Sequence, residues 1–121
     1  MPVTLAHVTF DCADPQRVAG FWSSVLETPV DEGASEFFAS IDNHVAEKPS
    51  WFFIKVPEPK TSKNRLHIDL TAADREAEAT RIIGLGATQH SDHNEWGAEW
   101  TVLTDPEGNE FCIGQQPLDS R

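Results

Sequence analysis

The first pattern along the chain is an alternation of apolar and polar positions over residues 3–11, in the segment VTLAHVTFD. β-Branched and aromatic residues at this two-residue period predict a strand. A helix is expected to follow, because Asp14 can cap its free N–H groups and Pro15 suits the first helical position. Its apolar side chains recur at helical spacing as one stripe: Val18, Phe21, Trp22, Val25 and Leu26. This stripe predicts a helix packed on a sheet.

Two short apolar segments follow at residues 36–41 and 51–56, with polar residues between them. They predict a pair of hairpin strands. The next segment, VPEPKTSKN, has two prolines and no apolar period, so it predicts a connector. We therefore expect module one at about residues 1–57, the connector at about 57–64 and module two at about 65–116.

The same pattern then restarts in the second half of the chain. Residues 66–70, LHIDL, predict a strand, and residues 75–85 predict a helix with Asp74 as its N-cap and Gly86 at its end. The apolar face of this helix is thinner and consists of Ala79, Ile82 and Ile83. Further strands are expected around residues 87–89, 99–104 and 110–113, with a DPEGN turn between the last two.

The two halves form an approximate internal repeat. Asp14 follows His7 by seven residues, and Asp74 follows His67 at the same spacing. The same order of elements then follows in both halves. The sequence therefore predicts one α+β domain over residues 1–121, built from two copies of strand–helix–three strands.

Composition narrows the classes of function. The formal net charge is −11, so most of the surface would repel phosphate, and a nucleic acid partner is not expected. No segment approaches the ~20 apolar residues of a membrane span, and the N-terminus lacks a signal-peptide pattern, so we expect no membrane partner and a cytoplasmic protein. Cys12 and Cys112 are expected to be reduced, half-buried thiols. Four basic residues fall in one short stretch: Lys55, Lys60, Lys63 and Arg65. They are interpreted either as part of a solvated connector or as a cluster that attracts a small anion.

Several polar residues share one face of the predicted strands. Because side chains alternate, His7 lies opposite Val8 and Phe10, which point toward the helix. His67 and Glu110 occupy the corresponding faces of their own strands. Two imidazoles and one carboxylate suit Zn²⁺, Ni²⁺, Mn²⁺ or Fe²⁺ and leave open positions for water or substrate. The alternative, judged from the residues alone, is that these histidines are polar core or surface residues.

Three segments carry a resemblance to a known family: HVTFDCADP, NRLHIDL and DPEGNEF. They resemble segments of glyoxalase-like domains of the vicinal oxygen chelate superfamily, which includes glyoxalases, bleomycin resistance proteins and dioxygenases. The resemblance implies two βαβββ modules that form a cup-shaped mixed sheet around a divalent metal ion. By position, it assigns His7, His67 and Glu110 as the metal ligands.

The resemblance also implies a fourth ligand position at the end of module one, expected near Trp51, Phe52 or Phe53. None of these side chains binds metal. Similar enzymes that isomerise glutathione hemithioacetals use a carboxylate there, so strict glyoxalase I activity is not expected. Two His and one Glu look more like the fosfomycin-modifying and extradiol-dioxygenase branches. Against these branches, the chain has no Tyr for acid–base chemistry and is shorter than two-domain extradiol enzymes.

A substrate pocket is expected on the same face as the metal ligands, and core packing is the alternative role of its aromatic residues. Its expected members are Trp51, Phe53, Asp69, Trp100 and Cys112. The other histidines, His44, His90 and His93, lie in polar segments and are expected in solvated turns.

Two functions are favoured over a third, a structural or partner-binding domain, because strand alternation places three potential ligands on one face. The first is a metal-dependent lyase, isomerase or transferase, whose ion polarises a carbonyl or stabilises an oxyanion of a small oxygen-rich substrate. The second is a metal-free small-molecule binding or drug-sequestering protein of the bleomycin-resistance type. The retained ligand residues favour the first, since binding-only members of the superfamily tend to lose them. In either case we expect a homodimer, because short paired modules usually associate in this superfamily.

Overall fold

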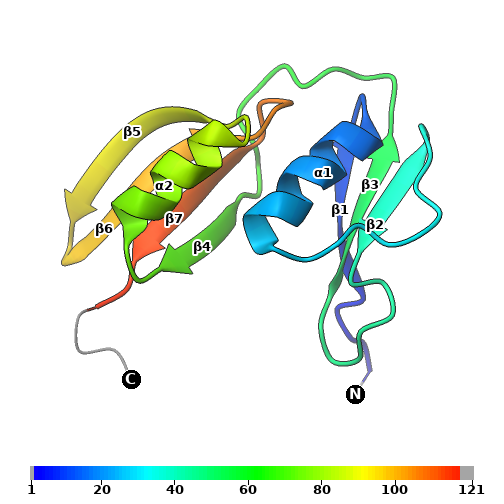
Figure 1. Cartoon of the computed structure of the whole chain (residues 1–121), viewed down its shortest axis with the longest axis horizontal. Coiled ribbons are helices and arrows are strands. Elements are labelled where there is room, and N and C mark those ends of the chain that lie inside the picture. The colour runs from blue at the N-terminus through cyan, green and yellow to red at the C-terminus, as the bar shows by residue number, and fades with distance from the viewer. Residues whose placement is uncertain (1, 118–121) are drawn as a thin grey trace. The chain divides into compact units, whose positions relative to one another are not determined.

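The computed structural model describes residues 2–117, which form two helices and seven strands (Figure 1). The chain divides into two compact units, unit 1 at Met1–Pro59 and unit 2 at Lys60–Arg121. Each unit consists of one mixed sheet and one helix. The predicted α+β class is therefore confirmed.

Unit 1 has its helix packed on a three-stranded sheet of order β1-β3-β2. In this sheet β3 pairs parallel with β1 and antiparallel with β2. The elements are β1 (His7–Cys12), α1 (Pro15–Leu26), β2 (Phe38–Ile41) and β3 (Ser50–Lys55).

Helix α1 begins and packs as the sequence predicts. The Asp14 side chain accepts a hydrogen bond from the Arg17 backbone N–H at 3.3 Å, and Pro15 occupies the first helical position. Four of the five residues of the apolar stripe are buried and Leu26 is half-buried, while Trp22 is completely enclosed. Its indole packs against the rings of Phe10 and Trp51, with centroids 5.7 and 5.4 Å away. The core of unit 1 therefore lies between α1 and one face of the sheet.

Unit 2 repeats this arrangement with one more strand, in the order β4-β7-β6-β5. Helix α2 packs on one face of the sheet, and the side chains between them form the core: Ala79, Ile82, Leu103, Phe111 and Ile113. The elements are β4 (Ile68–Ala72), α2 (Arg75–Gly84), β5 (Thr88–Glu95), β6 (Ala98–Thr104) and β7 (Glu110–Gln115).

The internal repeat is visible in the strand register. In unit 1 the parallel pair aligns His7 with Ser50, and in unit 2 it aligns Ile68 with Phe111. The sequence separation is the same in both pairs. One element of the repeat is missing, because unit 1 has two strands after its helix and not the predicted three. An isolated bridge between Val30 and Ile41 stands where unit 2 has a full strand. The chain turns away just beyond this bridge, in a polar segment that contains Gly33 at φ +96°.

The opening strands are shorter than predicted. β1 starts at His7, not at residue 3, because its partner β3 starts at Ser50, directly opposite. β4 likewise starts at Ile68, so His67 lies one residue before the strand. Leu66, which belongs to the predicted strand, is 74% exposed as a result. Ile83, expected on the apolar face of α2, is also exposed.

The segment around His90 and His93 is a strand, and the prediction of solvated turns there was wrong. Both histidines lie in β5, which forms the edge of its sheet and pairs with β6. The turn lies beyond them at Trp96 and Gly97, which both have positive φ, as a tight hairpin turn requires. An edge strand with few buried side chains needs no apolar alternation, so pattern reasoning missed it. His44 does lie in a turn, as expected.

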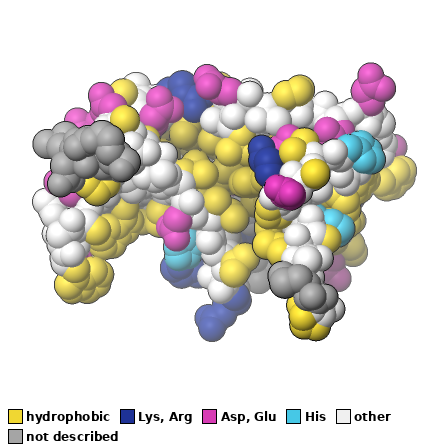
Figure 2. Space-filling view, turned by 90° about the horizontal axis from the view of Figure 1, so that it is seen from below, with side chains coloured by type: hydrophobic (Ala, Val, Ile, Leu, Met, Phe, Trp, Pro, Cys, Tyr) yellow, Lys and Arg dark blue, Asp and Glu magenta, His cyan; other side chains and the backbone are white. Residues whose placement is uncertain are grey.

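No helix in the part of the chain that the structure describes is long and apolar enough to cross a membrane. Neither cysteine is in a disulfide: Cys12 is buried and Cys112 is half-buried. On the face shown in Figure 2, hydrophobic side chains are prominent and the acidic side chains lie mostly along the upper edge of the view.

Candidate functional site: the groove of unit 2

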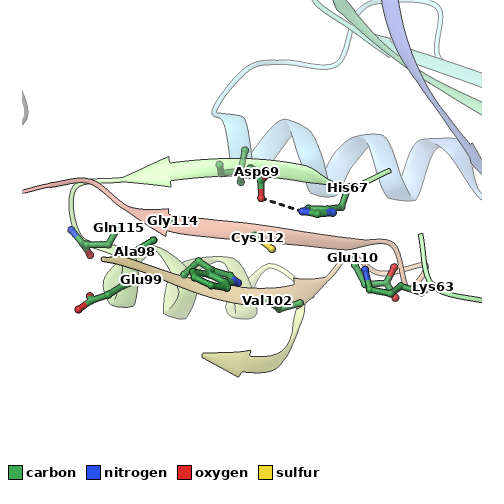
Figure 3. Close-up of a pocket in the computed structure, with 12 residues that line it drawn as sticks. Lys63, His67, Asp69, Ala98, Glu99, Val102, Glu110, Cys112, Gly114 and Gln115 are labelled. Atoms are coloured by element: carbon green, nitrogen blue, oxygen red, sulfur yellow. Dashed lines mark ion pairs between the residues drawn. The ribbon is translucent and has the colours of Figure 1, made fainter. Parts of the chain in front are cut away.

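An open groove of about 560 Å³ lies on the sheet of unit 2 (Figure 3). Strand alternation creates it, because Phe111 and Ile113 are buried and the residues between and beside them face the other way. Its polar and aromatic walls include Lys63, His67, Asp69, Trp100, Glu110 and Cys112. Asp69, Trp100 and Cys112, expected at a substrate pocket, therefore all line this groove.

Three potential metal ligands converge in the groove. His67 Nε2 lies 3.3 Å from Asp69 Oδ1 (Figure 3). Asp69 also stands directly opposite Cys112 in the parallel register of β4 and β7. One donor atom from each of the three residues lies within 4.8 Å of the other two. The groove thus combines an imidazole, a carboxylate and a thiol at one point.

The Cys112 thiol is kept protonated by its surroundings. Burial raises its pKa, the nearby Asp69 carboxylate raises it further, and the positive charge of Lys63 opposes them. At neutral pH Cys112 is therefore a thiol and not a ready nucleophile.

The Glu110 carboxylate, in contrast, is held in its charged form. Its Oε1 accepts a hydrogen bond from the Asn64 backbone N–H at 2.9 Å and lies 3.4 Å from Lys60 Nζ. Burial alone would raise the pKa of this carboxyl, but the backbone hydrogen bonds and Lys60 outweigh it, and the pKa is lowered. Glu110 is therefore ionised at neutral pH, as a metal ligand must be.

The three metal ligands assigned by resemblance are divided between the two units. His67 and Glu110 line the same groove in unit 2. His7 is exposed at the start of β1 in unit 1, where its ring stacks on Phe52 with centroids 4.0 Å apart.

Two aromatic residues expected at the pocket lie elsewhere. Trp51 and Phe53 pair in register with Val8 and Phe10, so they face α1 and not the side of His7. Phe53 is fully buried, and Trp51 stacks on Phe10 with centroids 5.8 Å apart. Neither residue lines the groove of unit 2, and both contribute to core packing in unit 1. Phe52 is the aromatic side chain that shares the face of His7.

The register also corrects the expected position of the fourth ligand. In unit 2, Ile68 is paired with Phe111, so Glu110 stands at the position opposite His67. In unit 1 the residue opposite His7 is Ser50. Ser50 is therefore the counterpart of Glu110 in the repeat. The expected position near residues 51–53 was therefore too far along β3. Ser50 is buried and its hydroxyl donates to the Asp42 carbonyl at 3.3 Å. Unit 1 thus presents no carboxylate at this position.

Sequence reasoning did not connect the partners of Glu110 to it. Lys60 and Asn64 belong to the connector, which was interpreted as solvated or anion-attracting. They meet Glu110 because the connector folds back beside the start of β7. No local sequence pattern predicts this contact. The cluster of basic residues was the one feature of the sequence that pointed to an acidic partner for the connector.

The sequence matches the glyoxalase-like domain family over residues 7–114, and the protein therefore belongs to this family. A comparison with curated proteins gave no match.

Solved structures of the vicinal oxygen chelate type share the fold. One is a glyoxalase/bleomycin resistance protein/dioxygenase family enzyme from Burkholderia phytofirmans PsJN, with 21% identity and a TM-score of 0.76, covering 93% of this chain and 98% of that one. Fosfomycin resistance protein FosX from Mesorhizobium loti has 16% identity and a TM-score of 0.71, with 98% and 96% covered. Lactoylglutathione lyase from Agrobacterium tumefaciens has 13% identity and a TM-score of 0.66, with 99% and 98% covered.

Proposed function

We propose that this protein is a divalent-metal-dependent enzyme that acts on a small oxygen-rich substrate by lyase, isomerase or transferase chemistry. The proposed ligands are His7, His67 and Glu110. The observation that carries the proposal is that His67 and an ionised Glu110 line one open groove. Two imidazoles and a carboxylate fit Zn²⁺, Ni²⁺, Mn²⁺ or Fe²⁺ and leave positions open for substrate oxygens.

A bound ion would supply Lewis acidity that polarises a substrate carbonyl or stabilises an oxyanion. The residues of the groove would perform the remaining tasks. The Lys63 ammonium attracts an anionic oxygen, and the Trp100 ring packs against an apolar part of the substrate. Asp69, 70% exposed beside His67, is the carboxylate best placed to accept a substrate proton. This role matters because the chain has no Tyr.

Metal content tests the proposal directly. Protein purified without chelator is expected to contain about one divalent ion per chain by elemental analysis. When the metal-free proteins are reloaded with Mn²⁺, which a thiol ligand does not favour, His67→Ala and Glu110→Gln are expected not to retain it, since removing one of three ligands leaves an incomplete site. His44→Ala, in a turn of unit 1, is the matched control and is expected to keep the metal. Absence of stoichiometric metal from the wild-type protein at neutral pH would overturn the proposal.

One observation favours the second candidate, a metal-free binding protein of the bleomycin-resistance type. Glu110 already has an ion pair with Lys60 and a hydrogen bond from Asn64, which compete with a metal ion. This candidate predicts that chelator leaves the affinity for a small-molecule ligand unchanged. It also predicts that Glu110→Gln retains that affinity, as a thermal-shift screen with and without EDTA would show.

We also propose that two copies of the chain associate. Proteins of this kind pair short modules, and closed two-fold association is the commonest solution. Sizing chromatography with light scattering is expected to give twice the chain mass of 13.4 kDa. A monomer at all concentrations would refute this association.

A further inference from the structure

We infer that unit 2 holds a second cation site, selective for a thiophilic ion such as Zn²⁺ or Cd²⁺, formed by His67, Asp69 and Cys112. This set differs from the proposed catalytic set in two of its three residues. It is contained within one unit of the chain. The inference therefore does not rest on the proposed function.

The geometry of the three donors is close to that of a bound ion. Ligand distances of about 2.1 Å for nitrogen and oxygen and about 2.3 Å for sulfur place neighbouring donors of a tetrahedral site about 3.4–3.7 Å apart. His67 Nε2 and Asp69 Oδ1 are already 3.3 Å apart. Every other donor pair lies within 4.8 Å, so side-chain movements of about 1 Å complete the set.

The backbone supports this convergence. Asp69 and Cys112 are paired in register on neighbouring parallel strands, which fixes their side chains on the same face of the sheet. His67 is not held in a strand and is half-exposed, so its ring has room to adjust. Two fixed donors and one adjustable donor suit a site whose ion enters from solvent. The groove leaves that entrance open.

The chemistry of the donors sets the type of ion. A thiolate ligand favours Zn²⁺, Cd²⁺ or another soft ion over Mn²⁺ and Mg²⁺, which prefer oxygen ligands. The Cys112 proton is released to solvent when the ion binds. The acidic side chains around the site are largely neutralised, because Glu110 is paired with Lys60 and Glu99 lies 3.8 Å from the Arg75 guanidinium. Lys63 opposes the remaining charge of Asp69. Binding is therefore expected to depend on sulfur coordination more than on net charge.

The site has a consequence for the proposed activity. Both sets need His67, and one imidazole nitrogen binds one ion. A thiophilic ion at the second site would therefore withdraw His67 from the first. Zn²⁺ or Cd²⁺ in excess is expected to compete with Mn²⁺ for the protein.

Cadmium titration tests the site, since a Cd²⁺–thiolate bond adds a charge-transfer absorption in the ultraviolet. Wild-type protein, kept reduced and freed of metal, is expected to develop this absorption and saturate at one Cd²⁺ per chain. Cys112→Ser is expected to abolish it, and Asp69→Asn to weaken binding at least tenfold. Because the Asp69 side chain is 70% exposed, the Asp69→Asn variant is expected to fold normally, which circular dichroism would verify.

Two variants serve as controls. Cys12→Ser removes the other thiol, which is buried in unit 1, and is expected to leave the cadmium absorption intact. Glu110→Gln removes a ligand of the proposed catalytic set and is also expected to leave it intact. Absorption that persists in Cys112→Ser, or that Cys12→Ser or Glu110→Gln abolishes, would overturn the inference. Binding of Mn²⁺ by Glu110→Gln tests the proposed function alone, whereas binding of Cd²⁺ by Cys112→Ser tests the second site. Failure of the proposed function and failure of this inference are therefore distinguishable.

Discussion

Replacing Lys60 by Met is expected to strengthen divalent metal binding at the proposed catalytic site. The Lys60 ammonium lies 3.4 Å from Glu110 Oε1, at the carboxylate that the proposal assigns to the metal. A metal ion must displace or approach this positive charge in order to bind Glu110. Removing the charge leaves the carboxylate with its hydrogen bond from Asn64 and with full negative charge available to the ion.

The magnitude follows from the exposure of the pair. Two unit charges about 4 Å apart interact by about 1 kcal/mol in water and about 4 kcal/mol at an effective dielectric constant of about 20. The Lys60 and Glu110 side chains are 26% and 22% exposed, so solvent screens part of the interaction. A gain of about 1–2 kcal/mol in binding free energy is reasonable, which corresponds to roughly 5- to 30-fold tighter binding.

Isothermal titration calorimetry with Mn²⁺ measures this change, because Mn²⁺ avoids the thiol of Cys112. Lys55→Met is the matched control, since it makes the same change in net charge but breaks an ion pair with Glu36 in unit 1. If the Lys60 and Lys55 variants bind Mn²⁺ with equal affinity, Glu110 is not a metal ligand and the reasoning fails.

Three further predictions concern stability and follow from contacts described by the structure. Arg75→Ala should lower the free energy of unfolding by about 2–4 kcal/mol in urea denaturation, because the largely buried guanidinium donates to Asp92 and Thr101; a loss below 1 kcal/mol would contradict this. The lowered pKa of Glu110 means that its ionised form stabilises the fold above its ordinary pKa of 4.5, and this contribution is lost as the pH falls through the folded-state value. The stability difference between wild type and Glu110→Gln should therefore shrink on acidification, and a constant difference would argue against the contribution. Gly97→Ala should cost about 1 kcal/mol in thermal unfolding, because φ of +78° disfavours a side chain; an unchanged melting temperature would refute this.

Much of the fold was predictable because its signals are local. Asp14 and Pro15 mark the start of α1 whatever surrounds them, and the spacing of Val18 and Trp22 identifies its buried face. The repeated spacing of Asp74 from His67 extended the same argument to unit 2. These features depend on residues within a few positions of one another, which a single sequence displays.

The site was less predictable because it depends on register between distant segments. Trp51 and Phe53 lie on one face of β3 and Phe52 lies on the other. A shift of one residue in the pairing register would exchange the two faces, and the sequence does not display this register. The contacts of Lys60 with Glu110 and of Asp69 with Cys112 join residues more than 40 positions apart. Alternation did place Glu110 and Cys112 on one face correctly, since both lie on a single strand.

The polar edge strand of unit 2 also limits how copies of the chain can meet. β5 is the edge strand of its sheet, so one of its sides has backbone N–H and C=O groups that no other strand in the described part of the chain pairs. In an apolar strand, another chain could form hydrogen bonds with this edge and extend the sheet. β5 carries the acidic residues Asp92 and Glu95, so a second copy of β5 docking against it would bring acidic groups from two chains together. Growth of a continuous intermolecular sheet through β5 is thereby discouraged. Association of two copies of the chain would therefore have to use a surface other than this edge.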